Sequence, residues 1–227
     1  MALRGRTWQR AIAAAAAIAT VAVLGLGASS LAATNASSAP TSVRSDDAMS
    51  KRAFHDGMRR LWEDHVAWTR LFIVSFAGDL PDLQATTNRL LQNQVDIGDA
   101  VKPFYGKAVG NQLTTLLTQH ILTAADLLAA AKAQDTTAFD QAKAVWYANA
   151  RQIARFLHDA NAKNWPLADL RSMMKTHLDL TLEEAADQLG GDYAASVAVY
   201  DQVETEILGM ADMLSKGIID QFPGKFA

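Results

Sequence analysis

Apolar residues in this chain recur at intervals of three and four from about residue 53 to residue 226. Such spacing places them on one face of an α-helix, whereas a half-buried β-strand would need sustained alternation, which the sequence lacks. The chain contains no Cys, so neither disulfides nor thiolate metal sites can stabilise it. The pattern therefore predicts an all-α domain that depends on the packing of amphipathic helices.

Helix breakers and capping residues divide this region into six predicted helices. The first spans residues 53–78, and the second follows Pro81 and stops before Pro103. The others are bounded by a polar cap at Asp135 or Thr136, by a cap at Asp192 and by Gly190-Gly191, which gives residues 107–132, 137–160, 167–190 and 193–221. Because short connections favour antiparallel neighbours, we expect an up-and-down helical bundle of four long and two shorter helices.

The two halves of the domain resemble each other weakly, as a duplicated three-helix unit would. Both duplication and convergence on a common packing rule explain the likeness, because amphipathic helices aligned by phase always share an apolar face. A polar residue occurs at the same phase in every aligned pair. Offsets of 83 to 86 residues superpose His65 on Asn149, Gln94 on His177 and His120 on Glu206.

The first 52 residues differ in composition from the rest. Residues 1–10 carry three Arg and no acid, and residues 11–27 form an unbroken run of apolar and small residues. This order is typical of a cleavable export signal, with cleavage expected after Ala32. Residues 33–52 predict a flexible linker before a helical domain over residues 53–227. An uncleaved anchor is the alternative, although 17 Ala-rich residues fall short of the ~20 that span a bilayer.

The mature domain is acidic, because cleavage leaves 18 Lys and Arg against 24 Asp and Glu, a net charge of −6. This balance predicts no basic patch for nucleic acid or anionic lipid. Gly-rich phosphate loops and Gly-x-Ser-x-Gly are absent from the sequence. We expect an exported protein, periplasmic or extracellular, without stable membrane insertion after cleavage. Binding is favoured over catalysis, although enzymatic activity stays open.

Three His and one Glu fall on the apolar faces of different predicted helices. Burying imidazoles and a carboxylate is costly unless they pair with one another or bind a cation. Facing helices of a bundle are common sources of metal ligands, and this donor set suits a divalent transition metal. The sequence therefore predicts a metal or small-ligand site with His65, His120, His177 and Glu206 as direct ligands and with Gln94 and Asn149 beside it.

A metal-free polar network is the alternative interpretation of the same residues. In it, the imidazoles bond to neighbouring polar side chains and only fix the register of the bundle, and the protein acts through its surface as an envelope or stress-related protein. No Glu-x-x-His or His-Glu-x-x-His motif is present to decide between the two. The remaining histidines, His55 and His158, lie near predicted helix ends and are interpreted as surface or capping residues.

Several segments carry a resemblance to a known group of proteins. They are Leu-Trp-Glu-Asp-His-Val-Ala-Trp-Thr-Arg at 61–70, Arg-Leu-Leu-Gln-Asn-Gln-Val-Asp-Ile-Gly at 89–98 and Pro-Phe-Tyr-Gly at 103–106, with residues 210–218 and 221–223 near the C-terminus. They resemble exported, all-helical bacterial proteins of unknown activity that often carry a glycosyltransferase label in genomes. The resemblance covers nearly all of the mature domain and implies its fold and location, but it transfers no catalytic residue. A nucleotide-sugar transferase needs a phosphate-binding α/β scaffold or a membrane-embedded lipid-phosphate site, and the sequence predicts neither.

Overall fold

The computed structural model describes residues 49–227, and these residues are almost entirely helical. The α-helices are α2 (Lys51–Ala77), α3 (Leu83–Lys132), α4 (Thr136–Ala160), α5 (Leu167–Gly190) and α6 (Tyr193–Gln221), followed by the 3₁₀ turn η1 (Pro223–Lys225). The prediction of an all-α bundle is confirmed. The predicted signal peptide, residues 1–32, and most of the predicted linker, residues 33–52, lie outside the described residues.

The long helix α3 is a hairpin of two helical arms. Gly106 interrupts it with φ 84° and ψ 166°, a backbone conformation that favours glycine. Beyond Gly106 the chain reverses its direction. The evidence is the close approach of two glycines, since a Cβ placed on Gly98 would lie 2.7 Å from the carbonyl oxygen of Gly110. A straight helix would separate these two glycines by about 18 Å. Residues 83–105 and 107–132 therefore run antiparallel and touch at Gly98 and Gly110.

Six helical rods thus make up the described part of the chain, but their lengths differ from expectation. Helices α2, α4, α5 and α6 have 27, 25, 24 and 29 residues, so the division into four long and two shorter helices is wrong. The predicted stop before Pro103 is also wrong, because Pro103 lies inside α3 and the chain reverses only at Gly106. A proline removes one helical hydrogen bond without reversing the chain, whereas the positive φ of a glycine permits the reversal.

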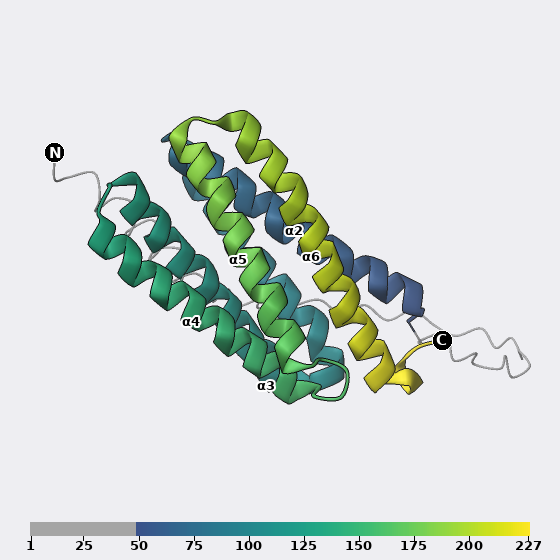
Figure 1. Ribbon diagram of the computed structural model, residues 1–227. Coiled ribbons are helices and arrows are strands. Elements are labelled where there is room, and N and C mark those ends of the chain that lie inside the picture. Colours follow the sequence, from purple (N-terminus) through teal and green to yellow (C-terminus); the bar gives the residue numbers. More distant parts are fainter. Residues whose placement is uncertain (1–48) are drawn as a thin grey trace, which may run out of the picture. The chain divides into compact units, whose positions relative to one another are not determined.

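The rods pack side by side in up-and-down order (Figure 1). Helix α2 contacts α3 and α6, α4 contacts α3 and α5, and α5 contacts α6. Ser50, Asp135 and Asp192 cap α2, α4 and α6, each accepting a hydrogen bond of 3.0–3.1 Å from a backbone N–H three residues on. The caps predicted at Asp135 and Asp192 are confirmed, and α2 begins two residues before the expected domain boundary. None of the helices within residues 49–227 has the length and apolarity needed to cross a bilayer.

Aromatic side chains close the end of the bundle that contains Gly106. Phe54, Phe104 and Phe226 pack together with ring centroids 4.9–5.4 Å apart. Beside them, Trp165 is buried and its Nε1 donates a hydrogen bond of 3.3 Å to the carbonyl oxygen of Met213 in α6. This indole fills the space that a side chain would take at the next turn of α6, where the sequence has Gly217.

Gly217→Ala should lower the free energy of unfolding by about 1–3 kcal/mol, because an added Cβ would lie 2.0 Å from Trp165 Nε1. Gly209→Ala on the same helix is the matched control. Nothing lies within 4 Å of its added Cβ, so this variant should be neutral or more stable by up to about 1 kcal/mol. Urea unfolding followed by circular dichroism measures both. An unchanged stability of Gly217→Ala would contradict the tight contact.

A buried ion pair ties α2 to α5 and α6. Arg70 Nη1 donates to Glu184 Oε1 at 2.8 Å and to the hydroxyl of Ser196 at 3.2 Å. The side chain of Glu184 is 1% exposed. Burial raises the pKa of its carboxyl, and the Arg70 guanidinium opposes that rise. The carboxylate therefore depends on Arg70 for its charge compensation.

Arg70→Met should lower the free energy of unfolding by about 3–5 kcal/mol, since it leaves the Glu184 carboxyl buried without its cation. Combining Arg70→Met with Glu184→Met should recover most of that loss, because two apolar side chains then replace the pair. A double-mutant cycle of urea unfolding measures the coupling. If Arg70→Met and the double variant were equally stable, the buried Glu184 carboxyl would not depend on Arg70 for its charge compensation.

Candidate functional site

A polar cluster crosses the bundle near the midpoints of its helices. His65 of α2, His120 of the second arm of α3 and His177 of α5 are 2%, 3% and 5% exposed. The ring centroids of His65 and His177 are 5.8 Å apart, and those of His120 and His177 are 6.4 Å apart. Glu206 of α6 joins them, with its Oε2 3.4 Å from His177 Nδ1. The four predicted ligands therefore lie together, and none is isolated.

Asn149 of α4 holds His120 in one tautomer. Its amide Nδ2 donates to the carbonyl oxygen of Leu116 at 3.1 Å, which turns its Oδ1 toward His120 Nδ1 at 2.9 Å. An amide oxygen accepts a hydrogen bond, so His120 Nδ1 carries the proton and Nε2 keeps a lone pair. This is the arrangement by which a neighbouring group prepares a histidine to act as a ligand.

Gln94 of the first arm of α3 plays a comparable part beside His65. Its Nε2 donates to the carbonyl oxygen of Leu90 at 2.8 Å and lies 3.3 Å from His65 Nδ1. Asn93, which the sequence interpretation missed, supports this amide because its Oδ1 accepts from Gln94 Nε2 at 3.2 Å. The sequence signal for Asn93 was its position next to Gln94 in the middle of an apolar helix. All six predicted residues thus belong to one connected cluster.

Two imidazoles of this cluster, those of His65 and His120, are held neutral. Burial lowers the pKa of His65 well below its usual value, and the charges of His177 and His120 act in the same direction. For His120, burial and the charge of His177 lower the pKa to about 3. Neutral imidazole is the form that coordinates a metal ion.

The centre of the cluster contains polar atoms without hydrogen-bond partners. Within residues 49–227, His177 Nδ1 and both carboxylate oxygens of Glu206 are buried and form no hydrogen bond, although His177 Nδ1 and Glu206 Oε2 lie within ion-pair distance at 3.4 Å. The Glu206 side chain is only 11% exposed. Leaving such a carboxylate unsatisfied is costly unless a cation or a proton compensates it.

Two indole rings border the cluster and also have unpaired N–H groups. The Trp62 ring lies 5.7 Å from that of His65, and the Trp146 ring lies 5.4 Å from that of His120, between centroids. Nε1 of both tryptophans is buried without a hydrogen-bond partner in the described part of the chain. The cluster is therefore surrounded by hydrogen-bonding capacity that its own residues leave unused.

The donor atoms are not yet assembled as a complete metal site. Among residues 49–227, no group of three or more His, Asp or Glu side chains is arranged to hold a metal ion. The closest approach is the pair formed by His177 and Glu206. Binding a metal ion would therefore require side-chain rotations within the cluster.

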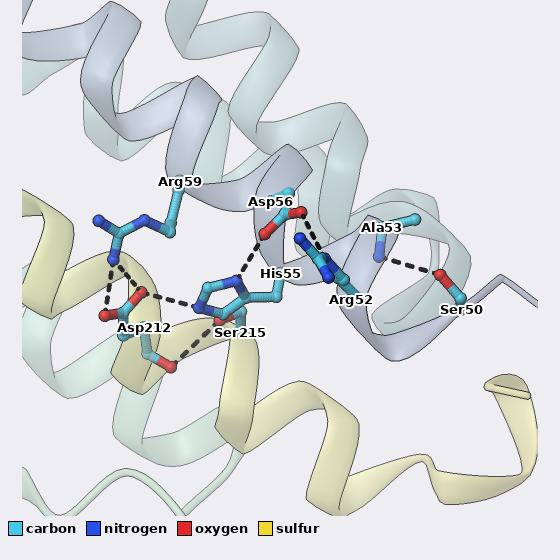
Figure 2. Close-up of polar contacts among 8 residues, drawn as sticks. All are labelled: Ser50, Arg52, Ala53, His55, Asp56, Arg59, Asp212 and Ser215. Atoms are coloured by element: carbon cyan, nitrogen blue, oxygen red, sulfur yellow. Dashed lines mark hydrogen bonds and ion pairs between the residues drawn. The ribbon is translucent and has the colours of Figure 1, made fainter.

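His55 lies in a separate network where α2 meets α6 (Figure 2). Its Nε2 lies 2.9 Å from Asp212 Oδ1, and its Nδ1 lies 3.0 Å from Asp56 Oδ1. Arg59 Nη1 donates to both carboxylate oxygens of Asp212 at 2.7 Å. His55 is partly exposed, as expected for a surface histidine outside the cluster.

His158 lies near the end of α4, outside the cluster. Its Nδ1 lies 2.8 Å from the carbonyl oxygen of Trp165, so it ties the end of α4 to the following loop. This contact fits a capping role, and the residue contributes nothing to the central cluster.

Comparison of the chain with protein-family models, with curated proteins and with solved structures found no match. The resemblance to exported helical bacterial proteins therefore stays a prediction. The assignment of function depends on the geometry of the cluster alone.

The stability of the domain should fall as the pH decreases from about 6.5 to 5. Over this range the unfolded chain protonates His65 and His120, whereas the folded protein, in which their pKa is lowered, does not. Each histidine should then remove about 1.4 kcal/mol per pH unit from the free energy of unfolding. Urea unfolding across this range measures the slope. His120→Gln should reduce it, and a flat profile in the unmodified protein would contradict the neutral state of His65 and His120.

Proposed function

We propose that the protein is an exported binding protein whose buried cluster takes up a divalent transition-metal ion. The observation that carries the proposal is the unpaired state of His177 Nδ1 and the Glu206 carboxylate, 3.4 Å apart in the core. A cation bound by both groups would compensate the carboxylate and use the imidazole lone pair. Export depends on the predicted signal peptide at residues 1–32.

The remaining donors of the cluster support this assignment. His65 and His120 are neutral, and Asn149 leaves Nε2 of His120 free to coordinate. With His177 and Glu206, they would form a set of nitrogen and oxygen ligands that suits Zn, Fe, Mn, Cu or Ni. Gln94 and Asn149 would orient the ligands from behind.

Assembly of the site requires a small contraction. Imidazoles that share a tetrahedral metal ion have ring centroids roughly 5 Å apart. The observed centroid distances of 5.8 and 6.4 Å exceed this by about an ångström. We infer that rotation of His177 toward Glu206 brings the donors together when the ion binds.

A metal-free register network is the second candidate, and the absence of a prearranged group of three ligands within residues 49–227 favours it. In this case the cluster fixes only the alignment of the rods, and the protein acts through its surface as an envelope or stress-related protein. The two candidates differ in the effect of the Glu206 charge. With a metal ion the carboxylate stabilises the fold, and without one it is a buried group that forms no hydrogen bond.

Elemental analysis of the protein purified from its native compartment should find about one transition-metal ion per chain. Glu206→Gln and His177→Gln should each lose the ion, because each removes a direct ligand. His55→Gln, which changes a histidine outside the cluster, should retain it. Adding the metal ion to chelator-treated protein should raise the melting temperature of the unmodified chain and of His55→Gln only.

The same variants separate the two candidates. In chelator, Glu206→Gln should raise the melting temperature, because the amide replaces a buried carboxyl that forms no hydrogen bond. With the metal ion added, it should be less stable than the unmodified protein. Metal absent from every preparation, with no response to added Zn²⁺ or Mn²⁺, would rule out the metal site and leave the register network.

A further inference from the structure

A groove on the surface between α4 and α5 combines positive charge with an apolar floor. Its volume is about 270 Å³. The buried residues Ala150 and Met174 lie at its base, and Tyr147 borders it. Its charged residues are exposed, and they are Arg151 of α4 with Arg171 and Lys175 of α5.

The cations of this groove are only partly compensated. Lys175 forms an ion pair with Asp179, whose carboxylate also accepts a hydrogen bond of 2.5 Å from the hydroxyl of Tyr147. Arg151 and Arg171 form no ion pair or hydrogen bond with any residue in the described part of the chain. One acid against three cations leaves a local charge of +2 in a domain that is acidic overall.

We infer that this groove binds a phosphomonoester, a small molecule with a dianionic phosphate and an apolar or aromatic organic part. A phosphate monoester carries about −1.5 to −2 charges at neutral pH, which matches the uncompensated charge of the groove. A guanidinium presents two parallel N–H groups to a phosphate, and Arg151 and Arg171 supply one such fork from each helix. The side chains of Tyr147, Ala150 and Met174 provide the apolar contact for the organic part.

The dimensions of the groove favour a small ligand over a polymer or a membrane. A volume of about 270 Å³ is close to the lower end of the range for ligand pockets, roughly 300 Å³. Nucleic acid and lipid surfaces bind to broader basic areas. Here the positive charge is confined to two facing helices, and the site is independent of the metal ion proposed for the core.

Isothermal titration of the full-length protein with phenyl phosphate tests this inference. In the presence of a chelator, so that the core metal plays no part, we expect a dissociation constant of about 10 μM to 1 mM. Combining Arg151→Gln with Arg171→Gln should weaken binding about tenfold or more. Arg155→Gln is the matched control, because it removes an exposed arginine of the same helix that does not line the groove. It should bind like the unmodified protein.

Three further ligands test each part of the assignment. Inorganic phosphate should bind more weakly than phenyl phosphate because it makes no contact with the apolar floor, and phenyl sulfate should bind more weakly because it carries one charge fewer. Vesicles that contain phosphatidylglycerol should not sediment the protein. The inference is overturned if phenyl phosphate at millimolar concentration gives no heat of binding, or if the double variant binds it with the same affinity as the unmodified protein. It is also overturned if phenyl sulfate binds as tightly as phenyl phosphate, or if the unmodified protein binds the vesicles and the double variant does not.

Discussion

A continuous helix over residues 83–132 would place Gln94 and His120 about 40 Å apart, at opposite ends of a rod. The positive φ of Gly106 instead folds α3 on itself, and the backbones of Gly98 and Gly110 lie in contact. Both polar residues then join one cluster, because the ring of His177 lies near those of His120 and of His65, which is beside Gln94. Every property of the central cluster depends on this reversal, because it supplies two of the six rods and two of the six polar side chains.

Burial determines the chemistry of the cluster once the rods are aligned. In the apolar core, the neutral forms of His65 and His120 are favoured, and hydrogen bonds from Gln94 and to Asn149 satisfy one nitrogen of each ring. Glu206 differs from them, because no hydrogen bond within residues 49–227 compensates its carboxylate. A core that served packing alone would favour an apolar or amide side chain at this position. The unsatisfied carboxylate is therefore the feature that separates a binding site from a register network.

The sequence predicted the helices and the composition of the cluster well, because both depend on local periodicity and caps. Placing one polar residue on the apolar face of each helix identified six members of the cluster but missed Asn93. The contacts between rods could not be predicted in the same way. Arg70 pairs with Glu184, and Asp212 pairs with Arg59, because these side chains meet only after the helices take their rotation about their axes. Such a rotation depends on the packing of many side chains at once.

The duplicated three-helix unit stays a prediction. In such a repeat, α2 and the two arms of α3 would correspond to α4, α5 and α6. The contact of α2 with the first arm of α3 would then match that of α4 with α5, and the contact of the second arm with α4 would match that of α6 with α2. Hydrogen bonds from Asn93 to Leu61 and from Asn149 to Leu116 confirm the contacts of the two arms, and the other helix pairs are also in contact. An up-and-down bundle of six rods produces the same neighbours without duplication, so packing alone does not decide the origin of the similarity.

The net charge of the domain is a sum, and it does not say where the individual charges lie. Binding depends on the field within a few ångström, and the groove between α4 and α5 concentrates three cations in a chain with excess acid. Its floor adjoins the cluster, since Ala150 follows Asn149 and Met174 lies one helical turn before His177. The cations oppose the approach of a divalent ion from this side. Glu206 lies on α6 instead, and both of its carboxylate oxygens are buried. The groove and this carboxylate therefore belong to different helices, so a phosphomonoester in the groove would not contact the proposed metal ligand Glu206.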